Sequence, residues 1–166
     1  MKLTAIVATD LRNAIGHQGR LPWPKMSRDL QRFKAATMGK LCVVGRKTAE
    51  GLPPLPGRHL VVLTRPETRH LVANRAGHVS HTVDNALFHA RMLGAEEVVV
   101  IGGADVYRQL LPRCDRLLLT VVHGEWPADV RLERPSEGFE RLSVETHDPD
   151  PHTPARVTFS EWVRKP

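Results

Sequence analysis

The chain has 166 residues, of which 41% are hydrophobic and 25% are charged. This composition is typical of one globular domain with a core, and no apolar run is long enough to span a bilayer, so we expect no membrane partner. The formal net charge is +6, but the basic residues are dispersed and aromatic residues make up only 5%. We therefore expect an anionic small molecule as ligand rather than nucleic acid.

Short β-branched and apolar runs alternate along the chain with segments of helical periodicity. The predicted strands are Leu3–Ala8, Leu41–Val44, His59–Leu63, His78–Ser80, Glu97–Ile101, Arg116–Val122, Arg141–Thr146 and Val157–Val163. The predicted helices are Ser27–Thr37 (with Ser27 as N-cap), Val83–Met92 (after Thr82, with Gly94 just past its end) and Ala104–Leu111. This order predicts the α/β class: one domain over residues 1–166, with a mixed, mostly parallel sheet of about eight strands, a C-terminal antiparallel hairpin and flanking helices.

The N-terminus and the cysteines indicate the compartment. Residues Met1–Asp10 form a short apolar stretch that soon meets charge, which predicts a first strand rather than a signal peptide. Cys42 and Cys114 are far apart and lack the spacing of metal ligands. We expect free thiols, no metal site and a cytoplasmic protein.

A carboxylate stands on the apolar face of the first predicted helix, shortly after Leu21-Pro22-Trp23. The apolar stripe consists of Met26, Leu30 and Phe33. Asp29 lies one helical step from two of these residues, so it shares their face. A carboxylate on the core side of a helix is costly to bury without a partner. A bound ligand that is cationic or donates hydrogen bonds would be such a partner. Alternatively, Asp29 stabilises the helix dipole or pairs with Arg32, and Trp23 is an ordinary core residue.

Two glycine-containing turns connect apolar strands to helices. Gly45-Arg46-Lys47-Thr48 follows one strand, and Gly102-Gly103 follows another. Backbone N–H groups at such a turn suit phosphate, and the basic side chains add charge for an anion. Gly102-Gly103 is not the Gly-x-Gly-x-x-Gly fingerprint, so a standard Rossmann site is not predicted. Ordinary tight turns remain the alternative for both.

Two further arginines lie around the strand His59–Leu63. Arg58 leaves the turn Leu55-Pro56-Gly57 and could bind a carboxylate through its guanidinium fork. Thr64 and Arg65 follow the carboxyl end of the strand, where open α/β sheets bind ligands. Each arginine can instead be a surface charge.

Taken together and in this order, the motifs resemble the dihydrofolate reductase family over roughly the whole domain. The residues that carry the resemblance are Ala14, Ile15, Gly16, Leu21, Pro22, Trp23, Asp29, Gly45, Arg46, Thr48, Leu55, Pro56, Gly57, Arg58, Ile101, Gly102, Gly103, Tyr107, Leu119 and Thr120. The resemblance implies reduction of dihydrofolate by NADPH in a monomeric enzyme. The pyrimidine reductases of riboflavin synthesis share the fold, but they are not expected to need Leu-Pro-Trp, the helix acid and Leu-Pro-Gly-Arg together. A basic nucleic-acid-binding module ranks well below both.

The resemblance also implies a role for each matching residue. Catalysis would involve Asp29, Trp23, Leu21 and Thr120. Substrate would contact Ala8, Asp29, Leu30, Phe33, Leu52, Leu55, Arg58, Ile101 and Thr120. NADPH would contact Ala8, Ile15, Gly16, Gly45, Arg46, Lys47, Thr48, Leu63, Thr64, Arg65, Ile101, Gly102, Gly103, Ala104, Val106 and Tyr107. Asn13–Pro24 would be a mobile loop over the nicotinamide.

Departures from the family pattern concern loops. One extra residue separates Trp23 from the acid, relative to the common bacterial version. Ala49 replaces a frequent Trp, and Val130 stands where a hydroxyl residue is usual. These changes affect loop dynamics and contacts to the substrate tail, and they leave the hydride-transfer centre as in the family.

Overall fold

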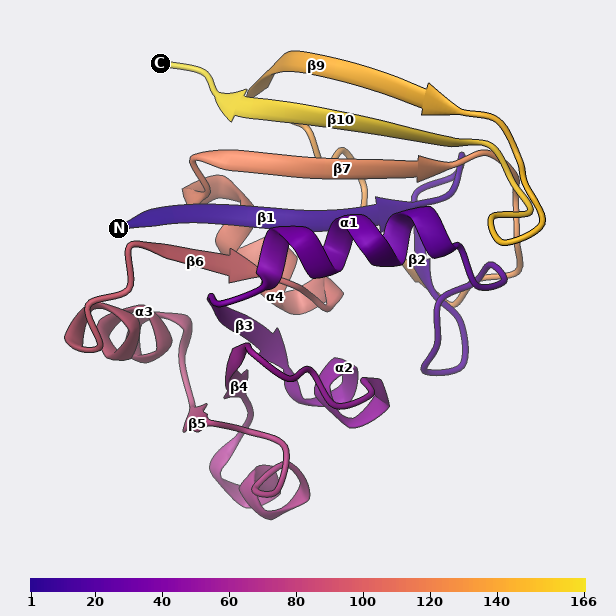
Figure 1. Ribbon diagram of the computed structural model, residues 1–166. Coiled ribbons are helices and arrows are strands. Elements are labelled where there is room, and N and C mark those ends of the chain that lie inside the picture. Colours follow the sequence, from indigo (N-terminus) through magenta and orange to yellow (C-terminus); the bar gives the residue numbers. More distant parts are fainter.

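The computed structural model describes all residues from Met1 to Pro166 and contains an eight-stranded sheet with the order β5-β4-β3-β6-β1-β7-β10-β9 (Figure 1). The strands of this sheet are β1 (Lys2–Thr9), β3 (Leu41–Gly45), β4 (His59–Leu63), β5 (His78–Ser80), β6 (Glu97–Val100), β7 (Arg116–Val122), β9 (Phe139–His147) and β10 (Val157–Arg164). The helices are α1 (Ser27–Thr37), α2 (Arg46–Gly51), α3 (Val83–Met92) and α4 (Ala104–Leu110), with short 3-10 turns η1 (Pro66–Leu71) and η2 (Leu111–Arg113).

The pairing confirms the predicted mixed sheet. Neighbouring strands from β5 to β7 run parallel, whereas β10 is antiparallel to both β7 and β9. The C-terminal hairpin is therefore β9–β10. All eight predicted strands exist, with ends displaced by at most a few residues.

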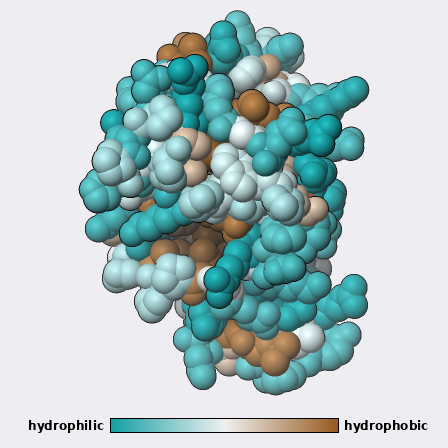
Figure 2. Space-filling view, turned by 90° about the vertical axis from the view of Figure 1, so that its right-hand side faces the viewer, coloured by the Kyte–Doolittle hydropathy of each residue, from teal (hydrophilic) through white to brown (hydrophobic).

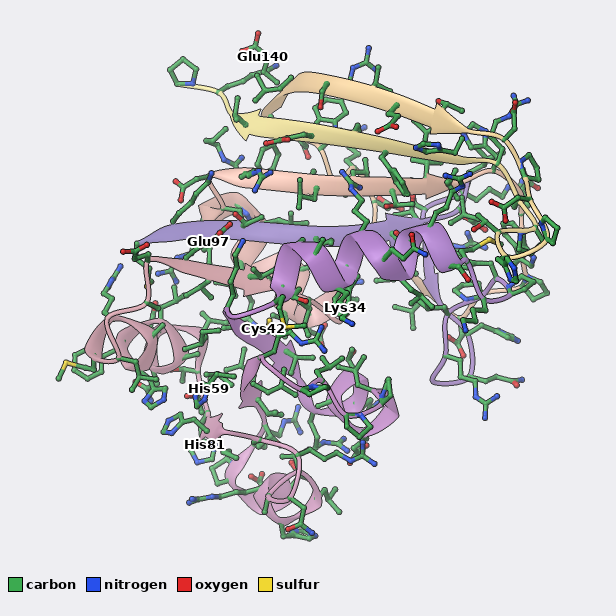
Figure 3. The ribbon with its side chains drawn as sticks, in the orientation of Figure 1. Lys34, Cys42, His59, His81, Glu97 and Glu140 are labelled. Atoms are coloured by element: carbon green, nitrogen blue, oxygen red, sulfur yellow. The ribbon has the colours of Figure 1, made fainter.

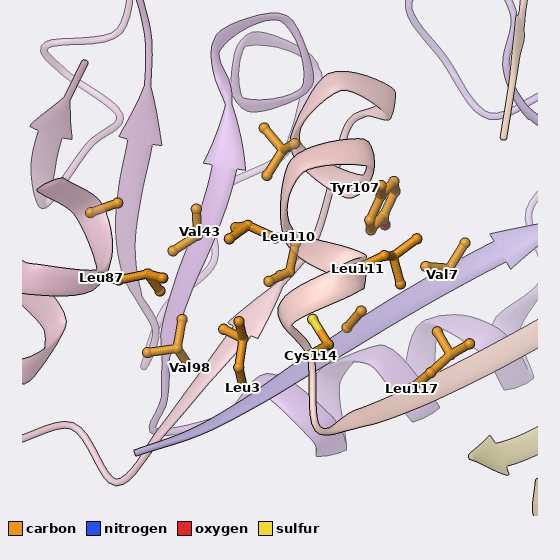
Figure 4. Packing of buried hydrophobic residues seen from close by; sticks show 14 of the residues in the cluster. Leu3, Val7, Val43, Leu87, Val98, Tyr107, Leu110, Leu111, Cys114 and Leu117 are labelled. Carbon is orange, nitrogen blue, oxygen red and sulfur yellow. The ribbon is translucent and has the colours of Figure 1, made fainter. Parts of the chain in front are cut away.

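Helices cover both faces of the sheet, and this explains the continuously apolar strands. On one face α3 and α4 pack against a large core cluster that includes Val7, Val43, Leu87 and Leu110 (Figure 4). On the other face α1 and α2 cover Ile6, Val44 and their neighbours. Alternate residues of the central strands, such as Val43 and Val44 of β3, thus enter different cores.

The predicted capping residues are confirmed for helix α3 but not for the N-terminus of helix α1. The Thr82 hydroxyl accepts a hydrogen bond from the Asn85 amide at 3.1 Å, as expected of an N-cap. Gly94, just past α3, has φ of +70°, a conformation that glycine adopts without strain. The prediction of Ser27 as an N-cap is wrong: Ser27 is the first helical residue, and Met26 precedes it without a side-chain cap.

Two features of the fold lie outside the predicted elements. A small sheet pairs β2 (Ala14–Gly16) with β8 (Val130–Arg131), segments too short to show periodicity. Glu97 lies at the start of β6 (Figure 3). Its carboxylate accepts a hydrogen bond from the Thr4 hydroxyl at 2.6 Å and pairs with Lys40 at 2.7 Å. No helix has both the length and the apolar character needed to cross a membrane.

Candidate functional site

The carboxyl ends of the parallel strands meet at one end of the sheet, where β2 also lies (Figure 1), and β8 pairs with β2. The strand register places Gly45 next to Leu63, and Ala8 next to Thr120. Figure 2 looks onto this end and shows hydrophobic atoms deep in a hollow that is framed by hydrophilic ones. An apolar hollow at the carboxyl ends of strands is where open α/β sheets bind ligands.

The two glycine turns, distant in sequence, contact each other. The Gly45 amide donates to the Gly102 carbonyl at 2.7 Å. A Cβ atom on Gly103 would lie 2.8 Å from Thr48 Oγ1, and one on Gly45 would lie 3.2 Å from Val106 Cγ2. Neither glycine has space for a side chain, because the atoms of the two turns already lie in contact there. The peptide bond between Gly102 and Gly103 is cis.

The helix acid Asp29 faces the sheet opposite Thr120. Asp29 lies in the first turn of α1 and is partly buried, whereas Thr120 is buried. Burial raises the pKa of Asp29, while the Thr120 hydroxyl and the positive charge of Arg32 act in the opposite direction. The Arg32 guanidinium donates its hydrogen bonds to Thr120 and to carbonyls of the sheet, so the predicted alternative of a direct pair with Asp29 does not describe its contacts.

Apolar side chains from three segments pack on the face of the sheet that α1 covers. Phe33, Leu52 and Leu55 pack together on the core cluster that contains Ile6 and Ile101. Leu30, on the same helix, is 42% exposed. The predicted apolar walls therefore lie on the α1 face of the sheet, and Leu30 is the most exposed of these side chains.

The arginine of the Pro-Gly turn is held near the end of α1. Gly57 has φ of +79°, which the turn requires and which glycine readily adopts. The following residue, Arg58, donates through Nη1 to Thr37 Oγ1 at 3.3 Å. Its Nε is buried and lacks a hydrogen-bond partner. A buried donor without an acceptor is costly, and an anionic ligand group could satisfy it.

The basic residues near the glycine turns differ in whether their charge is free to bind an anionic ligand. Arg46 pairs with Glu50 at 3.0 Å along α2, while Lys47 and Arg65 are exposed. Thr64 is buried, and its hydroxyl lies 2.7 Å from that of Thr68. Lys47 and Arg65 are thus the accessible cations of this group.

Tyr107 is tied to the sheet rather than free. Its hydroxyl donates to the Ile6 carbonyl at 2.7 Å. Burial raises the pKa of Tyr107, so its phenol stays protonated and holds α4 against β1. Its ring would lie 3.2 Å from a Cβ on Gly102.

The Leu-Pro-Trp segment divides between solvent and core. Leu21 is exposed, whereas Trp23 is buried with Met26, Val122 and Val157. The Trp23 and Trp126 rings meet edge to face, and their centroids lie 6.2 Å apart.

Sequence reasoning missed the residue that fixes the start of the loop 13–24. Asp10 is buried, and its carboxylate accepts hydrogen bonds from the amides of Arg12, Ala14 and Trp126. Further along, the Gln18 amide donates to Asp129 at 2.8 Å. An acid at the end of an apolar run was the only signal, and it does not reveal such distant partners.

A family model described as dihydrofolate reductase matches residues 2–164. Dihydrofolate reductase type 3 of Salmonella typhimurium is 37% identical over 153 residues, which cover 90% of each chain. Dihydrofolate reductase of Bacillus subtilis is 31% identical, covering 98% of this chain and 95% of the relative. A structure of the Enterococcus faecalis enzyme with NADP(H) and RAB-propyl superposes with a TM-score of 0.85 at 29% identity, covering 99% of this chain and 97% of the other.

Proposed function

Because the chain belongs to the dihydrofolate reductase family, we propose that it transfers hydride from NADPH to C6 of dihydrofolate, with Asp29 as the carboxylate that binds the pterin. The observation that carries this assignment is the position of Asp29. It is a partly buried acid, opposite Thr120 and next to an apolar pocket wall, and it has no protein cation bonded to it. A ligand that donates from a ring N–H and an amino group would offset its burial.

The site fits a dinucleotide cofactor. The Gly45 amide donates to the Gly102 carbonyl, and neither Gly45 nor Gly103 has space for a Cβ atom, so the two turns pack closely and bring their backbone together where a pyrophosphate would lie against them. Gly45, Lys47, Thr48, Gly102 and Gly103 would hold the phosphates. Thr64 and Arg65 would hold the ribose 2′-phosphate. Arg46 could also bind this phosphate, but its guanidinium already pairs with Glu50. When bound, the nucleotide supplies the hydride.

The remaining cofactor contacts would come from the other side of the hollow. Ala8, Ile15, Gly16, Ile101 and Tyr107 would line the nicotinamide slot, together with Leu63, Ala104 and Val106 along the nucleotide. Burial of Ile101 and Tyr107 supports a rigid, dry wall.

Substrate would be held at both ends. Ala8, Leu30, Phe33, Leu52 and Leu55 would contact the rings, and Ile101 would separate them from the cofactor. Arg58 would bind the terminal carboxylate of the substrate, which supplies an acceptor for the unpartnered buried Nε.

No side chain is placed to deliver the proton to N5 of the pterin. Asp29 would fix the ring and favour its protonated form electrostatically, with Thr120 orienting Asp29. Water gated by the segment Leu21–Trp23 would donate the proton. The exposure of Leu21 beside the buried, anchored Trp23 supports a segment that is fixed at one end and free at the other.

The cellular setting is proposed on simpler grounds. Both cysteines are free and buried, as in proteins of a reducing cytoplasm. We place the protein there as a monomer with one domain.

The direct test is to mix the purified protein with NADPH and dihydrofolate and follow the loss of NADPH absorbance. We expect rapid loss with NADPH and slower loss with NADH. Replacing dihydrofolate by a ribosylamino-pyrimidine reductase substrate should give no loss. Turnover of that pyrimidine without turnover of dihydrofolate would favour the riboflavin-pathway alternative.

A further inference from the structure

Arg32, on the buried side of α1, makes an unusual set of contacts for a helix arginine. Its Nη1 donates to the Leu119 carbonyl and to Thr120 Oγ1, both at 3.0 Å, and its Nη2 donates to the Ser160 carbonyl at 2.9 Å. The guanidinium carbon lies 4.7 Å from the centre of the Phe159 ring. The side chain therefore joins the helix of Asp29 to strands β7 and β10 at a single place.

The hydrogen bond to Thr120 determines which way that hydroxyl points. A threonine hydroxyl has one proton to donate, and an arginine can only donate. Since Thr120 Oγ1 accepts from Arg32, its own proton is directed away from the guanidinium. That leaves the proton free to turn toward the Asp29 carboxylate, whose pKa the Thr120 hydroxyl lowers.

The geometry points to Arg32 as a positioning residue for Asp29: it orients the Thr120 hydroxyl toward the carboxylate and keeps a positive charge behind it without occupying its oxygens. This inference rests on the proposed role of Asp29 in binding the pterin. It adds a residue that contacts neither substrate nor cofactor in the proposed site.

The charges around the pair are consistent with this role. Arg32 faces Glu161 and Glu145 from the C-terminal hairpin and Arg116 from β7, besides Asp29 on its own helix. Its positive charge lowers the pKa of Asp29, against the dominant effect of burial, which raises it. Without Arg32, burial would act with less opposition, and Asp29 would be ionised less often at a given pH.

A buried Tyr107 also faces Asp29 from α4, but its phenol is bonded to the sheet and remains neutral. Arg32 is therefore the charged group whose replacement is expected to shift the pKa of Asp29.

The test is a carbon NMR titration of the Asp29 carboxyl group in the ligand-free full-length protein, with the signal assigned by its loss in Asp29→Asn. We expect Arg32→Met to move the Asp29 midpoint to higher pH than in the wild type. Arg32→Lys, which keeps the charge, should bring it back toward the wild-type value. Arg28→Met is the matched control, because it removes the same charge from the same helix where the partner is Asp150 at 3.2 Å, and it should leave the midpoint near that of the wild type.

Binding supplies the second measurement. Arg32→Met should weaken dihydrofolate binding about tenfold and leave NADPH binding within about twofold of the wild type. Only the contact between Asp29 and the pterin depends on the hydrogen bond from Arg32 to Thr120. If Arg32→Met fails to fold, Arg32→Gln carries the same expectation, since it removes the charge but keeps an amide donor. An unchanged Asp29 midpoint in the folded neutral variant would overturn the inference. Failure of the wild type to reduce dihydrofolate would instead overturn the proposed function.

Discussion

The contact between the two glycine turns gives the most specific structural prediction. In Gly103→Ala the new methyl group would lie 2.8 Å from Thr48 Oγ1, a separation that carbon and oxygen do not sustain without a shift. Either the Thr48 hydroxyl rotates away or the two turns move apart, and both changes disturb a contact in which the Gly45 amide and the Gly102 carbonyl lie 2.7 Å apart. Overpacking of this kind costs about 1–3 kcal/mol of folding free energy.

Both turns are proposed to hold the cofactor phosphates, so the same shift should weaken NADPH binding. A misplacement worth about 1.4 kcal/mol in binding corresponds to a tenfold higher Kd. NADPH fluorescence titration measures the binding, and urea unfolding measures the stability.

The double variant Gly103→Ala/Thr48→Ala removes the clashing hydroxyl and should recover part of the stability lost in Gly103→Ala, relative to Thr48→Ala alone. The reasoning is refuted if Gly103→Ala binds NADPH as tightly as the wild type and unfolds at the same urea concentration. If the stability loss of the double variant equals the sum of the losses of the two single variants, the contact with Thr48 is not the cause of the loss in Gly103→Ala.

Two other predictions concern single charged residues. Because burial raises the pKa of Asp29, the folded protein loses stability as pH rises from the unfolded to the folded pKa of this group. Asp29→Asn should therefore raise the urea midpoint at neutral pH and not in strong acid; a lower midpoint at neutral pH would contradict the assigned shift. Arg65→Gln should weaken NADPH binding about tenfold while NADH binding stays the same, since only NADPH carries the 2′-phosphate. Arg69→Gln, a nearby exposed arginine, is the control, and an equal loss in both variants would assign the effect to general charge.

The sequence was sufficient for the elements that rest on local patterns. Apolar runs such as Val98–Ile101 predict strands covered on both faces, and Val98, Val99 and Val100 are fully buried between two cores. Helix α3 follows from its periodicity and from the Thr82 cap. The predicted cap at Ser27 is wrong because the preceding chain, at Met26, is held by tertiary packing with Trp23 rather than by a side-chain cap.

The site was predictable as a series of motifs but not as a set of contacts. The family pattern predicts roles for Asp29 and Thr120, whereas helix spacing alone suggests that Arg32 would pair with Asp29. The structure shows Arg32 bonded across the sheet to Ser160, a residue 128 positions away. Asp10 is a similar case, since its carboxylate binds the Trp126 amide 116 positions away. Such partners depend on strand order and register, which local periodicity does not encode.

The central claim is that Asp29 binds the pterin and favours its protonated form. The decisive measurement is the single-turnover rate of NADPH oxidation by Asp29→Asn with dihydrofolate, from neutral to acid pH. We predict a rate about 10²-fold or more below the wild type at neutral pH, with partial recovery in acid, where the substrate is protonated by solvent. An unchanged rate at neutral pH would contradict the claim.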